Sequence, residues 1–74
     1  MLTSKLNFHV DRSEISYLRW VIESYDGIAF LKTIDPMMAI IELEISSGCE
    51  MIVYNLLEHL RRQENIKIDQ TEYN

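Results

Sequence analysis

The 74-residue sequence predicts a small α+β domain with the element order βαββαβ. Three observations predict this fold. Three short segments alternate apolar and polar residues with a period of two, which is typical of half-buried strands, and a fourth is β-rich and apolar on both of its faces. Two longer segments repeat apolar residues at intervals of three and four, which places these residues on one face of a helix. An Asp-Pro pair between the second and third strands is a turn signal.

The four strands are expected at residues 6–10, 28–34, 39–45 and 66–69. Asp35 and Pro36 lie between the second and the third. Proline presets the backbone for the second position of a turn, and an aspartate before it can accept hydrogen bonds from the turn backbone. The second and third strands are therefore expected to form a hairpin.

The two helices are marked by apolar stripes and by sequence signals at their ends. The first should start at Asp11, where Glu14 follows at capping-box spacing, and should end at Gly27. Ser47 and Glu50 have the same spacing at the start of the second. The first stripe consists of Ile15, Leu18, Ile22 and Tyr25, and the second of Cys49, Ile52, Val53, Leu56, Leu57 and Leu60.

This order of elements is that of the ferredoxin-like split βαβ fold. Right-handed crossovers place both helices on one face of a four-stranded antiparallel sheet, with the first and third strands in the centre. We expect one domain over residues 1–74, with a core at about 5–69 and a polar tail at 70–74. A chain this short cannot form two independent cores.

Composition narrows the classes of protein to which the chain can belong. A net charge of −5 and dispersed basic residues argue against binding to nucleic acids, whose phosphates need cations. The single cysteine excludes an internal disulfide and favours a reducing cytoplasm. We expect no membrane segment, because no apolar stretch approaches the ~20 residues that span a bilayer. Domains of fewer than ~80 residues often need a partner subunit for stability, so self-association is expected.

The sheet face that the helices leave open is predicted to carry an interface. Four apolar residues from the hairpin strands alternate onto this face: Ile28, Phe30, Met38 and Ile40. Trp20 lies opposite the apolar stripe of the first helix, and tryptophan is enriched at binding hot spots. The alternatives are that one strand is shifted by one residue, that the tail covers the patch, or that Trp20 is an ordinary exposed side chain.

Catalytic chemistry is not indicated by any constellation of residues. Cys49 lies on the apolar stripe of the second helix, where it is expected to pack as a small hydrophobic side chain. The only candidates for a small enzyme are Glu42, Glu44 and His9 on the open face. The two histidines have no neighbours at ligand spacing, so we expect no metal site, and nothing in the sequence predicts a cofactor.

Two stretches resemble an uncharacterised family of short bacterial domains. They are YLRWVIESYDG at residues 17–27 and LKTIDP at residues 31–36, in which an acidic-x-Tyr-acidic-Gly helix end leads into a Thr-x-Asp-Pro hairpin. The match covers about residues 5–68. It implies a bacterial, cytoplasmic origin, and the family has no established activity to transfer.

The architecture is also similar to that of ACT domains, which dimerise and often bind amino acids at the subunit interface. The first loop of that family usually reads Asp-Arg-Pro-Gly. Asp11 and Arg12 match it, whereas Ser13 and Glu14 replace the proline and the glycine. The resemblance implies a small-molecule site at Asp11, Arg12 and Ser13.

We therefore expect a non-catalytic binding or assembly module, a homodimer or the partner of another protein, that associates through the open sheet face or a sheet edge. An ACT-like sensor of a small molecule is the first alternative. A small enzyme subunit is the second.

Overall fold

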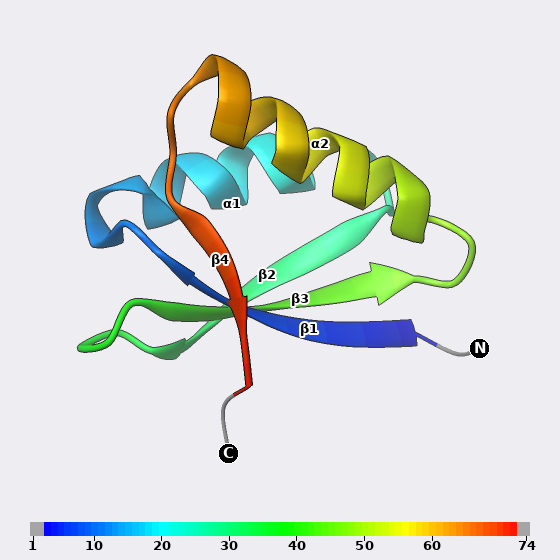
Figure 1. Cartoon of the computed structure of the whole chain (residues 1–74). Helices are drawn as coiled ribbons and strands as arrows, with labels where there is room; N and C mark the ends of the chain where they lie inside the picture. The colour runs from blue at the N-terminus through cyan, green and yellow to red at the C-terminus, as the bar shows by residue number, and fades with distance from the viewer. Residues whose placement is uncertain (1–2, 73–74) are drawn as a thin grey trace.

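The computed structural model describes residues 3–72 and has the predicted order of elements (Figure 1). A short 3₁₀ helix, η1 (Arg12–Glu14), precedes the first α-helix. The other elements are β1 (Thr3–Val10), α1 (Ile15–Glu23), β2 (Ala29–Asp35), β3 (Ile40–Ser46), α2 (Glu50–Gln63) and β4 (Ile68–Thr71).

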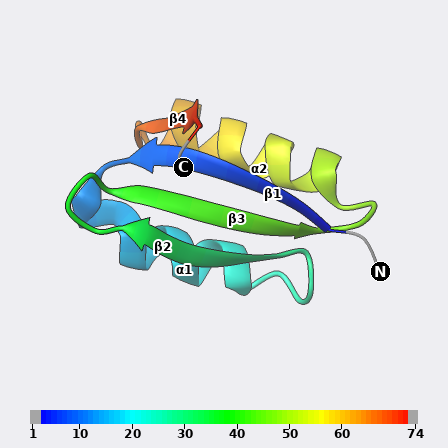
Figure 2. The ribbon, with the colours of Figure 1, turned by 90° about the horizontal axis from the view of Figure 1, so that it is seen from below.

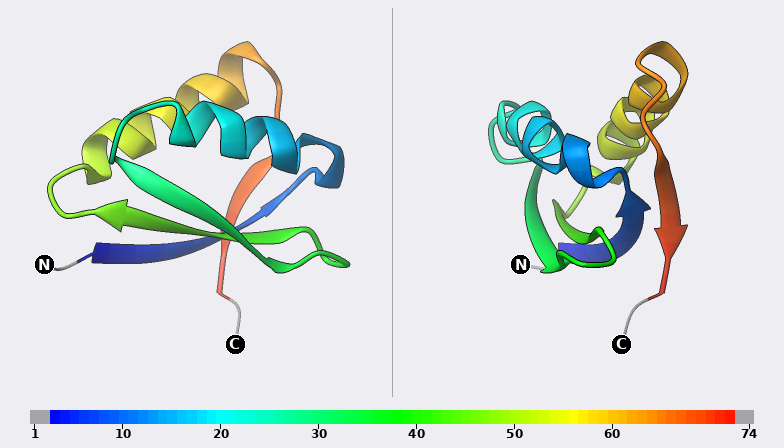
Figure 3. Two further views of the ribbon diagram at one scale, coloured as in Figure 1. Left: turned by 180° about the vertical axis from the view of Figure 1, so that it is seen from behind. Right: turned by 90° about the vertical axis from the view of Figure 1, so that its left-hand side faces the viewer.

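The strands form one antiparallel sheet in the order β2-β3-β1-β4, which confirms the ferredoxin-like fold. β1 and β3 are central and β2 and β4 are the edges, as the two crossovers require. Both helices lie on the same face of the sheet (Figure 3). Seen from the opposite face, α1 lies behind the β2 side of the sheet and α2 behind the β1 and β4 side (Figure 2).

The core lies between the helices and the sheet, and it consists of the alternate strand residues that the period-two pattern places on the helix side. The register pairs Phe8 with Ile41 and Leu31 with Leu43, so these four side chains lie on one face. The most deeply buried side chains are Phe8, Leu18, Ile22, Ile41, Leu43, Ile45, Val53, Leu57, Leu60 and Ile68. The apolar faces predicted for the sheet and for most of each helix are therefore confirmed.

The ends of the elements differ from the sequence predictions. α1 ends at Glu23, and Tyr25 is exposed in the turn that follows rather than buried on the helix. Gly27 and Gly48 have positive φ angles of 76° and 88°, which a residue with a side chain adopts only with strain. β4 begins at Ile68, so Ile66 precedes it, and the expected tail residues 70 and 71 belong to it. The last two tail residues, 73 and 74, lie outside the described residues.

Neither predicted capping box forms. The carboxylate of Asp11 accepts a hydrogen bond from the backbone N–H of Lys67 at 3.2 Å instead of capping its own helix. α2 starts three residues after Ser47, with Cys49 at its N-cap position. Glu50 accepts from the Gly48 N–H at 3.0 Å and from the Ser4 hydroxyl at 3.2 Å, which joins α2 to β1. Asp11 and Glu50 therefore contact residues far along the chain, Lys67 and Ser4, in place of the predicted capping boxes.

Candidate functional site

The predicted apolar patch on the open sheet face does not exist as one surface. Phe30 and Met38 are 62% and 57% exposed, whereas Ile28 and Ile40 are only 9% and 7% exposed. Phe30 lies opposite Glu44 near the start of β2, while Met38 lies in the turn beyond its other end. Five residues of strand, 31–35, lie between Phe30 and the turn, so six steps of about 3.3 Å separate Phe30 from it by about 20 Å.

Ile40 is buried because it is flanked by strands on both sides. It pairs with His9 of β1 and with Asp35 of β2, at the β-bulge that shifts the β2–β3 register. Alternation along a strand assigns a residue to a face but does not show how closely the neighbouring strands cover it. The remaining open face is largely polar. It carries Lys5, Asn7, His9, Phe30, Lys32, Glu42, Glu44, Asp69 and Thr71.

The exposed large apolar residues gather mainly on the helix layer. Among the described residues, six of the nine large exposed apolar side chains lie on the helices or in the turn after α1: Tyr17, Trp20, Tyr25, Met51, Ile52 and Tyr54. Ile52 was expected on the buried stripe of α2, but it is exposed because it lies at the flank of this stripe. The candidate binding surface is therefore on the opposite side of the sheet from the predicted hairpin patch, and it contains Trp20, which the sequence analysis also predicted as an interface residue.

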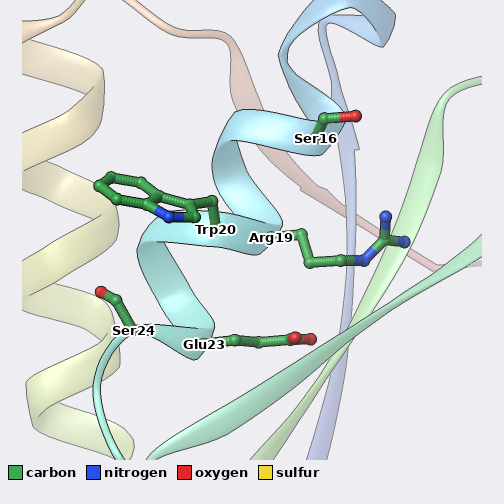
Figure 4. A pocket seen from close by; sticks show the side chains of 5 residues that line it. All are labelled: Ser16, Arg19, Trp20, Glu23 and Ser24. Carbon is green, nitrogen blue, oxygen red and sulfur yellow. The ribbon is translucent and has the colours of Figure 1, made fainter.

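Trp20 is the most exposed aromatic residue among them. It is 69% exposed on α1, directly opposite the buried Leu18 and Ile22. A shallow, open hollow of about 490 Å³ adjoins it, lined by Ser16, Arg19, Trp20, Glu23 and Ser24 (Figure 4). The indole leaves the helix on one side, and Arg19 and Glu23 leave it on the other (Figure 4).

Two polar contacts fix α1 against the edge strand β2. The guanidinium of Arg19 donates a hydrogen bond to the hydroxyl of Thr33 at 3.3 Å, and the carboxylate of Glu23 accepts one from the backbone N–H of Leu31 at 3.2 Å. These contacts stabilise the orientation of α1. Trp20 is therefore presented from a fixed helix rather than from a loop, which lowers the entropic cost of using it as an anchor.

Tyr17 stacks on Trp20, a contact that the sequence reading missed. The ring centroids are 6.3 Å apart, with 25° between the planes. The spacing i, i+3 on a helix could have revealed the pair, because such residues are neighbours on the helix surface. A hydrogen bond to Glu64, burial, and the negative charges of Glu64 and Glu14 raise the pKa of the Tyr17 hydroxyl. We call Tyr17, Trp20 and the adjoining hollow the Trp20 surface.

The residues expected to bind a small molecule take part in internal contacts. Asp11 accepts from the Lys67 N–H, and the guanidinium of Arg12 donates to the backbone oxygen of Met37 at 2.6 Å. These bonds tie the β1–α1 loop to the start of β4 and to the hairpin turn. Ser13 is exposed in η1. A carboxylate and a guanidinium can each make further hydrogen bonds beside these, so the small-molecule site at Asp11, Arg12 and Ser13 stays a prediction.

The candidate catalytic side chains lie on the open face, spread over two strands. Glu42 faces Asn7 and Lys32 across the sheet, Glu44 faces Lys5 and Phe30, and His9 faces Ile40. Within residues 3–72, no three acidic, histidine or cysteine side chains are placed so that they could hold a metal ion. Cys49 packs partly buried against the core, where it was expected.

Over the same described part of the chain, no helix is both long enough and apolar enough to cross a membrane.

Comparison with known proteins places the chain in a family without a known activity. No curated protein and no solved structure gave a match. The model of one family, described as "Domain of unknown function (DUF4911)", matches residues 8–63. These residues run from β1 to the last residue of α2 and include the whole Trp20 surface. Glu64, which contacts Tyr17, is the next residue along the chain. The chain therefore belongs to the DUF4911 family of short domains of unknown function.

Proposed function

We propose that this protein is a non-catalytic protein-binding module that uses the Trp20 surface as its contact. The observation that carries the proposal is the position of Trp20: highly exposed, stacked on Tyr17, and held on a helix that is itself fixed to β2. Tryptophan and tyrosine supply large, rigid contact areas, and a few such residues provide most of the energy at protein interfaces.

The distribution of polar groups also favours the helix layer over the sheet. The open face presents two lysines and three acidic side chains, Lys5, Lys32, Glu42, Glu44 and Asp69. The centres of protein interfaces are usually depleted of such residues. The homodimer through the sheet that the sequence suggested remains a prediction, and it competes directly with the Trp20 surface.

A photo-crosslinking experiment separates the two surfaces. A photoreactive amino acid replaces exposed Ser16, beside Trp20, or exposed Lys32, on the open sheet face, in cells that normally carry the protein. We expect protein adducts from position 16 and not from position 32. Mass spectrometry of each adduct shows whether the partner is a second copy or another protein.

The matched control is Met51→Ala. Met51 is 70% exposed on α2, so its side chain is as accessible as that of Trp20. Trp20→Ala should abolish the adduct from position 16, and Met51→Ala should leave it unchanged. Adducts from position 32 alone would overturn the proposal in favour of the sheet face.

A further inference from the structure

We infer that the Trp20 surface takes a basic segment of its partner, with an arginine or lysine side chain lying against the Tyr17–Trp20 pair. The inference rests on the proposed function and adds the chemistry of the occupant. It follows from two features of the described residues: an exposed pair of aromatic rings, and carboxylates beside them.

The aromatic rings suit a cation. Trp20 and Tyr17 stack with a centroid separation of 6.3 Å, and Trp20 remains 69% exposed. The face of an aromatic ring is the negative part of its quadrupole, and tryptophan gives the strongest attraction to arginine and lysine. The long apolar stem of either side chain can cover ring surface while its charge stays in water.

Two carboxylates add a negative field beside these rings. Glu64, the C-cap residue of α2, accepts a hydrogen bond from the Tyr17 hydroxyl, and Glu14 precedes Tyr17 by one turn. Glu14 and Tyr17 are three residues apart and therefore neighbours on the helix surface, and the charges of both carboxylates raise the pKa of the Tyr17 hydroxyl. A cation placed over Tyr17 is attracted by the same charges that disfavour the phenolate.

Each arginine of the chain donates a hydrogen bond within the molecule, which fixes the position of its positive charge. Arg12 donates to the Met37 oxygen, Arg19 to Thr33, Arg61 to the Ile68 oxygen and Glu58, and Arg62 to Glu58. Arg19 lines the hollow, but it leaves α1 on the side away from the indole (Figure 4).

A second copy of the chain is the less suitable occupant. Its net charge is −5, and two of its three lysines, Lys5 and Lys32, lie on the open sheet face. A symmetric contact through two Trp20 surfaces would bring like charges together, which opposes association. Charge complementarity therefore selects a basic partner.

Selection from a random peptide library, displayed on phage and presented to the whole chain, tests the inference. The selection is repeated against Trp20→Ala. We expect the wild-type chain to enrich peptides with arginine or lysine, and the variant to lose this enrichment. Synthetic peptides of the winning sequences are then titrated by fluorescence, since Trp20 is the only tryptophan and reports on the surface directly.

The outcomes separate the inference from the proposed function. Enrichment of acidic or uncharged peptides that depends on Trp20 would overturn the basic partner and keep the binding surface. Absence of enrichment, or enrichment that Trp20→Ala does not change, would overturn both. Trp20→Phe should retain part of the affinity, because it keeps an aromatic face.

Charge variants with a matched control test the role of the carboxylates. Glu14→Gln with Glu64→Gln removes two charges while leaving an amide oxygen that can accept from Tyr17. Asp69→Asn with Glu72→Gln removes two charges from exposed positions in and after β4. We expect the first pair to weaken binding of the basic peptide about fivefold and the control to change it less than about twofold, as for partly exposed ion pairs. Equal effects would show a non-specific charge attraction and overturn the inference.

Discussion

Glu23→Ala tests whether one side chain of α1 stabilises and protects the edge of the sheet. In β2, alternate residues bond to β3, and Leu31 lies between two of them, so its N–H points away from β3 towards the exposed edge. The Glu23 carboxylate accepts from this N–H at 3.2 Å. The substitution removes the acceptor and exposes the N–H to water or to another strand.

The size of the effect follows from the exposure of Glu23. A hydrogen bond to a charged group contributes about 1.5–3 kcal/mol, but water can replace an exposed acceptor, so we take the lower end, about 1.5 kcal/mol. The higher helix propensity of alanine returns up to about 0.4 kcal/mol. The net loss of about 1 kcal/mol corresponds to a fall in Tm of about 4–8 °C for a domain of this size.

Thermal unfolding followed by circular dichroism measures this loss, with Ser16→Ala as the control on the same exposed helix surface. The control should leave Tm unchanged or raise it slightly. A second measurement is the mass in solution at high protein concentration, because an uncovered edge strand can pair with another chain. If Glu23→Ala has a Tm no lower than that of Ser16→Ala and the same mass in solution, the hydrogen bond neither stabilises nor protects the edge.

Three further predictions test burial, charge and backbone conformation. Ile40→Ala should lower the free energy of unfolding by about 2–4 kcal/mol in denaturant titrations, and Phe30→Ala should lower it by less than about 1 kcal/mol, because only Ile40 is buried. Equal losses would contradict the burial of Ile40. Hydrogen bonds from Arg61 and Arg62 lower the pKa of Glu58 in the folded protein. The stability that these hydrogen bonds add is therefore fully present above the pKa of the unfolded chain, near 4.5, and is lost as the pH falls through the lower pKa of the folded protein. Glu58→Gln should therefore flatten the fall in Tm on acidification, and an unchanged profile would refute this role. Gly27→Ala should cost about 1–2 kcal/mol of stability through its positive φ alone, since nothing lies within 4 Å of an added Cβ, and a neutral result would contradict the strain.

The fold was predictable because its local patterns and its global topology agree. Alternation at Phe8 and Val10, the stripe through Leu18 and Ile22, and the Asp35-Pro36 turn each indicated the element that the structure contains. The position of Trp20 opposite the buried stripe was also available from the helical wheel. Such features depend on residues close in the sequence.

The remaining features depend on contacts between distant residues, which a single sequence does not reveal. The pairing of Asp11 with Lys67 and the burial of Ile40 between two strands follow only from the assembled sheet. The predicted hairpin patch is discontinuous for the same reason. Residues on one face of a hairpin need not form one patch when some are covered and the others lie at opposite ends.

The location of the binding surface is connected to the way in which the sheet edges are covered. Glu23 and Arg19 contact β2 at one edge, and Arg61 donates to the Ile68 oxygen of β4 at the other, at 2.6 Å. Side chains from the helices thus form hydrogen bonds with backbone or side-chain groups of both edge strands, which disfavours association by strand pairing. The same contacts hold α1 in place, and with it Trp20. A chain whose sheet edges are bonded in this way has its helix layer and its open sheet face left for recognition, and it carries its only tryptophan on the helix layer.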